Sequence, residues 1–451
     1  MRRGVYHVTD NEIKQRLELG LRPAEPPTIE GVLKQVSTHG VLRGPVDWVF
    51  PAWMLYVEYA TQRIIETFQL SEEERRQLLH FRDTMKQLLL KAWIQTKEKL
   101  TTLYKTVVEG TYRIEGNKLY ASDIVLYVNR TMHINIYGLN AETYFPNILK
   151  LPQEKLKWFQ LGWAASDEGR HGSWPLMNTT QSWQVFAWVA VRYGKLYVRV
   201  DSINLTRKGI SIIIELRAKN WTQLDKEVAI KLVVQNFKQG NWAPLLTMWL
   251  GDGVNTRNKV LSGEYELIIS SKDPQRLGQV RKTGLALITS GKEAFIKLRE
   301  VAGIYGNLLD LLSSHKWFTI KLATDDAFKA AYKQRYKNDK IKIGDVLMHL
   351  ELVTNKSGAL YAKRYIYNLD EALMYVERFR QIGIKTNIVH SSSGYAVYIS
   401  TANLLELAKK NEIIRKTIAK YLIDKAKNGT PKQREAASKL LNRHPFFIID
   451  H

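Results

Sequence analysis

The sequence predicts an α+β fold, in which antiparallel sheets carry helices on one face and a mainly helical N-terminal domain precedes them. Two observations support this prediction. The stretch 346–409 alternates strand and helix patterns in the order β-β-α-β-β-α. The stretch 53–108 has apolar side chains at helical spacing instead. Because 451 residues are many for one domain, we expect two or three.

The first 152 residues form the predicted N-terminal domain. Its prolines predict an irregular arm over 1–50, and two helices follow at 53–68 and 72–108. Ser71 and Glu74 have the spacing of a capping box, which marks the start of the second helix. Alternating apolar residues between 111 and 137 predict strands.

Residues 153–422 form the predicted α+β core. Its expected strands are 196–200, 210–216, 265–269, 346–353, 360–367, 386–389 and 396–400, and its expected helices are 225–237, 292–312, 369–381 and 403–409. Lys208 and Gly209 are expected to join the first strand pair. A basic helical tail, 423–451, closes the chain.

The charge balance indicates a polyanionic partner. Lys and Arg number 67 against 44 Asp and Glu, a formal net charge of +23. Such a field attracts nucleic acid first and an anionic membrane surface second. The alternative is a lysine-rich surface that serves solubility or high-temperature stability.

Several classes of chemistry are excluded by what the sequence lacks. It has no cysteine, and therefore no disulfide, thiolate redox or thiolate metal chemistry. It has no phosphate-binding Gly-x-x-x-x-Gly-Lys loop and no Gly-x-Ser-x-Gly elbow. Residues 1–16 lack the apolar segment of a signal peptide, and no window approaches the ~18 apolar residues of a membrane span. We expect a soluble, cytoplasmic protein with no membrane partner.

Two segments, 161–169 and 245–253, share one plan: a short apolar helix closed by a carboxylate and then a glycine. The glycine can end the helix in the left-handed conformation, and a cation is favoured at the negative end of the helix dipole. Glu168 and Asp252 on neighbouring helix ends could hold a divalent metal and act in phosphodiester cleavage. The alternative for each segment is a plain helix cap or turn.

The two segments resemble the paired LAGLIDADG motifs of monomeric homing endonucleases. The resemblance implies that the last acidic residue of each motif, Glu168 and Asp252, binds a catalytic Mg²⁺. It also implies two pseudo-symmetric α-β-β-α-β-β-α halves whose sheets form a saddle over the DNA major groove. The stretch 346–409 would suit the second half. The third motif position, usually glycine, is Trp163 in one copy and Thr247 in the other.

A second resemblance covers about 158–451. Segments around Thr179–Trp188, His315–Asp326, 427–434 and His444–Phe447 resemble an uncharacterised family of paralogues from hyperthermophilic crenarchaea. This resemblance implies an archaeal, thermophilic protein and assigns no activity.

Two basic groups are candidates for nucleic-acid contacts. Lysines and arginines interleaved with Tyr332 and Tyr336 could grip phosphate and stack on bases, although a solvated helix face explains them equally well. Cations beside the first strand pair could read a groove, or be ordinary exposed strand positions. The first group is Lys329, Lys333, Arg335, Lys337, Lys340 and Lys342, and the second is Lys195, Arg199, Arg207 and Lys208.

Two smaller signals have structural alternatives. Asp325 and Asp326 could form another acidic site, but two acids that open a helix usually act as its cap and dipole partners. His171, three residues after Glu168, could take part in proton transfer, although a lone loop histidine usually has no such role.

The first functional hypothesis is a monomeric, Mg²⁺-dependent endonuclease that cleaves duplex DNA. The second is a non-cleaving DNA- or RNA-binding protein on the same scaffold, either a transcriptional regulator or a splicing maturase. The third is a ribonucleoprotein or chromatin component that binds through charge alone, with affinity that falls steeply with salt.

Overall fold

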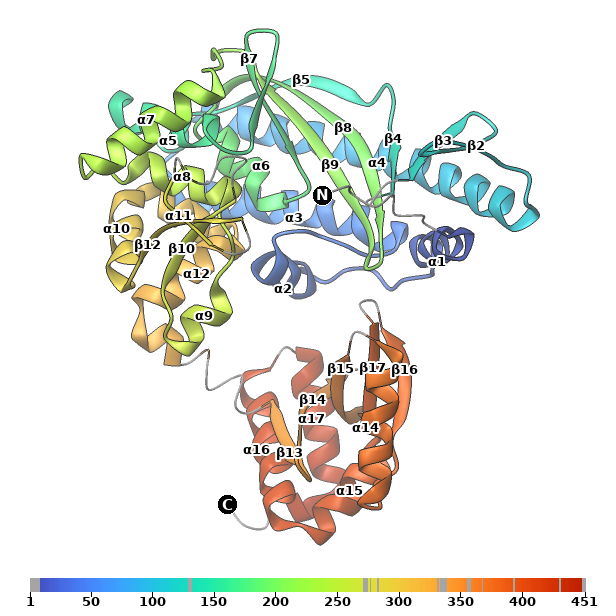
Figure 1. Cartoon of the computed structure of the whole chain (residues 1–451). Coiled ribbons are helices and arrows are strands. Elements are labelled where there is room, and N and C mark those ends of the chain that lie inside the picture. The colour runs from blue at the N-terminus through green and yellow to red at the C-terminus, as the bar shows by residue number, and fades with distance from the viewer. Residues whose placement is uncertain are drawn as a thin grey trace. The chain divides into compact units, whose positions relative to one another are not determined.

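The computed structural model divides the chain into two compact units, residues 1–326 (unit 1) and 327–451 (unit 2) (Figure 1). It describes residues 9–128, 132–270, 275, 277–281, 284–330, 332, 339–354, 358–366, 368–391, 394–429 and 431–447. Both units combine helices with antiparallel sheets, so the chain has the predicted α+β class. No helix in these ranges is long and apolar enough to cross a membrane.

This division differs from the boundaries expected at 152 and 422. Strands β4 (Met132–Asn135) and β5 (Asn140–Phe145) pair with β8 (Gly194–Thr206), so a cut at 152 would divide one sheet. Helix α16 (Glu412–Asn428) runs through residue 422 and supplies core side chains to unit 2. The predicted tail is therefore part of that unit.

Four helices open unit 1: α1 (Asp10–Leu21), α2 (Ile29–His39), α3 (Val46–Thr67) and α4 (Glu72–Glu109). The first two replace the irregular arm that the prolines predicted. They begin at Thr9 and Thr28, whose hydroxyls accept backbone N–H bonds, and the prolines lie between them or after them. Helix α4 starts with the predicted capping box of Ser71 and Glu74. In Figure 1, α3 and α4 run along the long strands of the sheet.

The larger of the two described sheets of unit 1 has the strand order β1-β2-β3-β4-β8-β9-β7-β6, and β5 also pairs with β8. The hairpin of β8 and β9 turns at Lys208 and Gly209, as predicted. Gly209 has φ +104°, and a side chain there would meet the backbone of Gly44 at 2.8 Å, so glycine is required. The remaining strands are β1 (Arg113–Glu115), β2 (Lys118–Ala121), β3 (Ile124–Val128), β6 (Glu168–His171), β7 (Trp174–Thr179) and β9 (Gly209–Ala218).

The elements from α5 (Gln153–Ala164) to α7 (Lys226–Lys238) follow the order α-β-β-α-β-β-α, with α6 (Ser182–Val189) in the middle. After α8 (Ala243–Asp252) the described elements follow a different order. The helix expected over 292–312 is interrupted at Gly303, which has φ +51°. The described elements of unit 1 after α8 are α9 (Arg257–Ser262), β10 (Glu266–Ile269), β11 (Gln279–Val280), β12 (Ala286–Ser290), α10 (Lys292–Ala302), α11 (Ile304–Leu311) and α12 (His315–Thr324).

Unit 2 is a five-stranded antiparallel sheet with four helices packed on one face. Its strand order is β13-β14-β15-β17-β16, so β14-β15-β17-β16 repeats the order β6-β7-β9-β8 of unit 1. The sequence predicted this β-β-α-β-β-α run within one or two residues at most ends. The elements are β13 (Lys340–Ile343), β14 (Val346–Val353), β15 (Ala359–Ile366), α14 (Leu369–Gln381), β16 (Asn387–Ser391), β17 (Gly394–Ile399), α15 (Thr401–Lys410), α16, α17 (Pro431–Arg443) and η2 (Pro445–Phe447).

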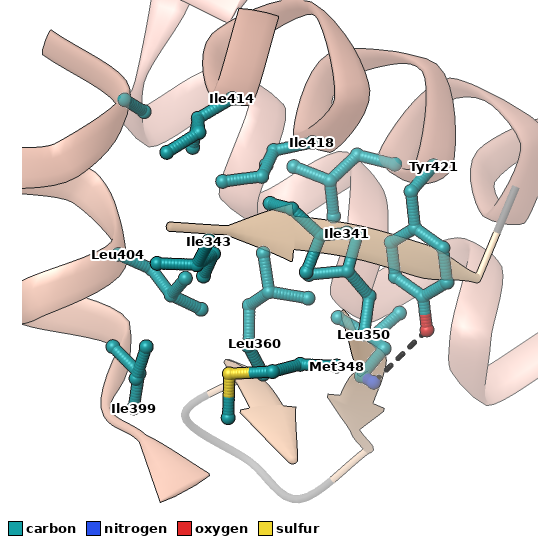
Figure 2. Packing of buried hydrophobic residues seen from close by; sticks show 14 of the residues in the cluster. Ile341, Ile343, Met348, Leu350, Leu360, Ile399, Leu404, Ile414, Ile418 and Tyr421 are labelled. Carbon is teal, nitrogen blue, oxygen red and sulfur yellow. Dashed lines mark hydrogen bonds between the residues drawn. The ribbon is translucent and has the colours of Figure 1, made fainter. Parts of the chain in front are cut away.

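The core of unit 2 lies between the sheet and its helices. Figure 2 shows strand side chains such as Met348 and Leu360 pointing toward helix side chains such as Leu404 and Ile418. Tyr421 of α16 closes one end, where its hydroxyl accepts a bond of 3.1 Å from the backbone N–H of Leu352. Burial of these apolar surfaces is the main favourable term in folding this unit.

Candidate functional site

Helices α5 and α8 pack against each other along their lengths. The contact is close because small residues lie at the crossing. A side chain at Gly162 would come within 2.7 Å of the backbone nitrogen of Met248 and closer still to the carbonyl of Pro244. A side chain at Gly251 would meet Ser166 Cβ at 2.6 Å. The two helices that the sequence paired therefore lie side by side at near-minimal separation.

A hydrogen bond joins the two helices inside this contact. Thr247 Oγ1 of α8 donates to the carbonyl oxygen of Phe159 in α5 at 2.8 Å. On the other helix, Ser166 Oγ donates to the carbonyl of Gly162 at 2.9 Å. Both hydroxyls are buried and satisfied, as buried polar groups must be. Thr247, which replaces the usual motif glycine, thus has a function in the packing.

The ends of α5 and α8 bring Asp167 and Asp252 together. Burial raises the pKa of Asp252, and the negative charge of Asp167 and a hydrogen bond between the two carboxyl groups also raise it. Lys226 and Lys316 lower it, and the resulting pKa is about 6. Two carboxyl groups that hydrogen-bond to each other lie close together. The sequence predicted a pair of acids at these helix ends, with Glu168 in place of Asp167.

Glu168 is not part of the pair with Asp252. Its carboxylate is buried, and both of its oxygens are engaged. Arg192 donates to Oε1 at 2.8 Å and to Oε2 at 3.2 Å, and Trp188 Nε1 donates to Oε2 at 2.9 Å. Burial raises the pKa of Glu168 although Arg192 opposes this. Glu168 is therefore the partner of a buried arginine, and Asp167 is the acid that interacts with Asp252.

The motif register explains the difference. Aligning the two segments on their final glycines placed Glu168 opposite Asp252. Aligning them on the residue at the helix crossing, Gly162 and Thr247, places a carboxylate five positions later in both, at Asp167 and Asp252. The crossing residue fixes which side chains meet at the helix ends. The spacing of five residues from Gly162 to Asp167 was the sequence signal that could have identified Asp167.

Helix α6 holds both acids of the first segment. Gln184 Nε2 donates to Asp167 Oδ2, and Thr179 Oγ1 donates to Gln184 Oε1. One turn later Trp188 donates to Glu168. These contacts point two adjacent carboxylates in different directions, one toward Asp252 and one into the core.

Two lysines at the helix ends were not predicted. Lys316 Nζ is buried and donates to three carbonyls of the last turn of α8, those of Trp249, Leu250 and Gly251. This arrangement satisfies the ammonium group and complements the negative end of the helix dipole. Burial lowers the pKa of Lys316 to about 8, and Asp167 and Asp252 oppose this effect.

Lys226, the first residue of α7, donates to the carbonyl of Ser166 at the end of α5. Each of the two helix ends thus has its own lysine. Both lysines come from helices distant in sequence from the motifs, so no spacing rule could have identified them.

The predicted nucleic-acid contacts beside the β8–β9 pair have carboxylate partners. Lys195 pairs with Glu142 at 2.8 Å, Arg199 with Asp201, and Arg207 with Glu12 at 2.9 Å. Lys208 is exposed in the turn. The first three lie at accessible positions, but a phosphate would have to compete with an acid for each of them.

The second basic group is only partly described. Lys329 is half-buried, and Tyr332 is helical. On β13, Lys340 is half-buried and Lys342 is exposed. Lys333, Arg335, Lys337 and Tyr336 lie outside the described residues.

The remaining candidates do not join the site. His171 ends β6 and stacks on Trp174, with ring centroids 6.4 Å apart. Asp325 follows α12, and Asp326, which opens the next helical stretch, pairs with Lys292 at 3.0 Å. Within the described ranges no group of three or more His, Asp or Glu residues is arranged to hold a metal ion, so a cation at the helix ends would have two protein carboxylates.

Comparison of the chain with protein-family models, with characterised proteins and with solved structures gave no match.

Proposed function

We propose that the chain is a metal-dependent DNA endonuclease of homing type, which cleaves phosphodiester bonds in duplex DNA and uses Asp167 and Asp252 to hold Mg²⁺. The proposal rests on the resemblance of the two helix segments to paired LAGLIDADG motifs. The observation that supports it most strongly is that two carboxyl groups meet at the ends of two closely packed helices. We further propose that the protein acts as a monomer in the cytoplasm.

The residues at the helix ends fit Mg²⁺. This ion commonly takes one or two carboxylate ligands and completes its octahedron with water and phosphate oxygens. The raised pKa of Asp252, about 6, reflects its burial and the negative charge of Asp167 beside it, both of which a bound cation would offset. Asp167 and Asp252 would be the protein ligands. The ion would stabilise the charge that develops on phosphate oxygens during cleavage.

The chain's own groups prepare this site. Gln184 fixes the orientation of the Asp167 carboxylate through its amide. Lys226 and Lys316 lower the pKa of Asp252, which favours the ionised form that binds a cation near neutral pH. The glycines at the crossing set the separation of the two acids. The net charge of +23 would attract the DNA backbone.

Cleavage of a supercoiled plasmid library in the presence of Mg²⁺ tests the proposal. We expect the wild type to linearise some library members, and expect Asp167→Asn and Asp252→Asn each to abolish cutting while duplex binding persists. Asp326→Asn, which removes an exposed acid elsewhere, is the matched control and should cut normally. Cutting that survives in both site variants would refute the proposed site.

A non-cleaving DNA- or RNA-binding protein, such as a transcriptional regulator or a splicing maturase, is the second candidate. One observation favours it: Lys226 and Lys316 already provide two positive charges near Asp167 and Asp252 without a metal. In that case the two acids and two lysines would stabilise the helix ends only. Specific duplex or RNA binding by a wild type that cuts no library member would favour this candidate.

A further inference from the structure

The sheet of unit 2 has two different faces. Along β14, the even-numbered residues from 346 to 352 are buried and the odd-numbered residues are accessible to varying degrees. The buried side chains join the core under α14 to α17. The opposite face, here called the outer face, carries aromatic, basic and a few apolar side chains. Its described members include Lys340, Lys342, Tyr361, Lys363, Tyr365 and Tyr398.

One row of directly paired residues crosses all five strands on this outer face. In sheet order the row is Lys340, His349, Lys363, Tyr398 and Asn387. Directly opposed residues in antiparallel strands point to the same side of the sheet. At the usual strand separation the row is roughly 19 Å long. The face therefore offers one continuous line of polar, basic and aromatic groups.

Three tyrosines provide ring surface on and beside this row. Tyr361 and Tyr398 lie edge to face, with centroids 5.4 Å apart. Lys363 Nζ lies 5.3 Å from the centre of the Tyr361 ring. Tyr365 is 54% exposed, and its hydroxyl donates to Glu351 at 2.9 Å. Aromatic rings held by neighbours on a rigid sheet are pre-organised surfaces on which flat groups can stack.

The charge of the outer face, and of the whole unit, is positive. Residues 327–451 contain 23 Lys and Arg against 11 Asp and Glu, about half of the chain's net charge in little more than a quarter of its length. The described positions of the outer face include one carboxylate, Glu351, and three lysines. Glu351 pairs with Lys363 at 2.8 Å. The chemistry of this face is complementary to an anion with flat, stackable groups.

We propose that the outer face of the unit 2 sheet binds single-stranded nucleic acid, with bases stacked on Tyr361, Tyr365 and Tyr398 and phosphates near Lys340, Lys342 and Lys363. Rings on a sheet can stack only on bases that are not already stacked in a duplex, which favours a single strand. A four-stranded sheet in a common RNA-binding module stacks two or three bases in this way. A lipid surface or an acidic protein would use the lysines but not the ring faces.

This inference is independent of the proposed endonuclease site, because all of its residues lie in unit 2 and Asp167 and Asp252 lie in unit 1. Binding is measured in EDTA, so that cleavage plays no part. Loss of cleavage with intact single-strand binding would count against the proposed function alone. Normal cleavage with no single-strand binding would count against this inference alone.

Fluorescence anisotropy with the full chain provides the test, using labelled dT₁₅, rU₁₅ and a 15-base-pair duplex. We expect tighter binding of at least one single strand than of the duplex. Tyr361→Ala with Tyr398→Ala should weaken single-strand binding by roughly 30-fold or more, because each lost base stack is worth about 5-fold or more. Tyr361→Phe with Tyr398→Phe keeps both rings and should bind within about twofold of wild type.

The lysines are tested separately with a charge-matched control. Lys340→Gln with Lys342→Gln should weaken binding. It should also reduce the slope of log Kd against log salt concentration by about 1.4, the value for two phosphate contacts on a single strand. Lys410→Gln with Lys420→Gln removes two exposed charges from the helices and should leave the slope unchanged. If the alanine pair fails to fold by circular dichroism, the lysine pairs decide the question.

Three results would overturn the inference. One is a duplex that binds more tightly than either single strand. The second is single-strand binding that is unchanged both in the alanine pair and in the Lys340 and Lys342 pair. The third is an equal loss in the phenylalanine and alanine pairs, because the hydroxyl groups and not the rings would then be responsible.

Discussion

The packing of α5 against α8 predicts a specific cost for adding one methyl group at Gly162. A Cβ there would lie 2.7 Å from Met248 N and closer to Pro244 O, whereas ordinary contact begins at 3.4 Å. Helix α8 must therefore retreat by at least 0.7 Å, because its backbone cannot rotate away as a side chain can. Overpacking of this kind costs about 3 kcal/mol, and alanine regains about 1 kcal/mol of helix propensity. We expect Gly162→Ala to destabilise unit 1 by about 2 kcal/mol.

Urea unfolding followed by tryptophan fluorescence measures this change in unit 1 alone, because all 12 tryptophans precede residue 327. The matched control is Gly169→Ala, where the nearest neighbour is the flexible Leu176 side chain at 3.4 Å. The free energy of unfolding of this control should stay within about 0.5 kcal/mol of the wild-type value. If Gly162→Ala behaves like this control, the close packing of α5 and α8 is refuted.

Three further predictions concern the charged groups at the helix ends. The raised pKa of Asp252, about 6, means that the folded protein retains a proton there which the unfolded chain loses above its ordinary value of 3.8. Stability should therefore fall as pH rises from about 4 to 6. Asp252→Asn should remove this slope in urea unfolding and raise stability at pH 7.5 by up to about 3 kcal/mol, and a slope that persists would contradict the raised pKa of Asp252. Glu168→Gln should cost about 3–5 kcal/mol, because it leaves Arg192 buried without its anion, and a neutral effect in the same assay would show that this ion pair is absent. Burial lowers the pKa of Lys316 from 10.5 to about 8. Between these values the unfolded chain binds more protons than the folded protein, so stability should rise with pH. Lys316→Met should flatten this rise, and an unchanged pH profile would count against the buried ammonium group.

Local sequence patterns predicted much of the fold. The capping box at Ser71 and Glu74 fixed the start of α4, and the alternation from 346 to 409 predicted the sheet of unit 2 almost residue by residue. These signals depend on neighbours a few positions apart. The helices α1 and α2 were missed because the prolines around them suggested an irregular arm, whereas the threonine caps at Thr9 and Thr28 act within one turn.

The candidate site was predictable only in part. The pairing of two short helices followed from their shared pattern, but the acids that meet depend on the register at the crossing, which Gly162 sets and the final glycines do not. The roles of Arg192, Lys226 and Lys316 depend on contacts between segments 24 to 66 positions apart. No local pattern encodes such contacts. The pairing of β5 with β8 across residue 152 is long-range for the same reason, and no local pattern predicts it.

Mn²⁺ binding measured by electron paramagnetic resonance at pH 7.5 would show whether Asp167 and Asp252 together hold one divalent cation. Mn²⁺ stands in for Mg²⁺ because both favour oxygen ligands. We predict that the full chain and Asp326→Asn bind the same number of ions, and that Asp167→Asn and Asp252→Asn each bind fewer by one site. Equal Mn²⁺ binding by the wild type and both site variants would show that these two carboxylates do not hold the ion.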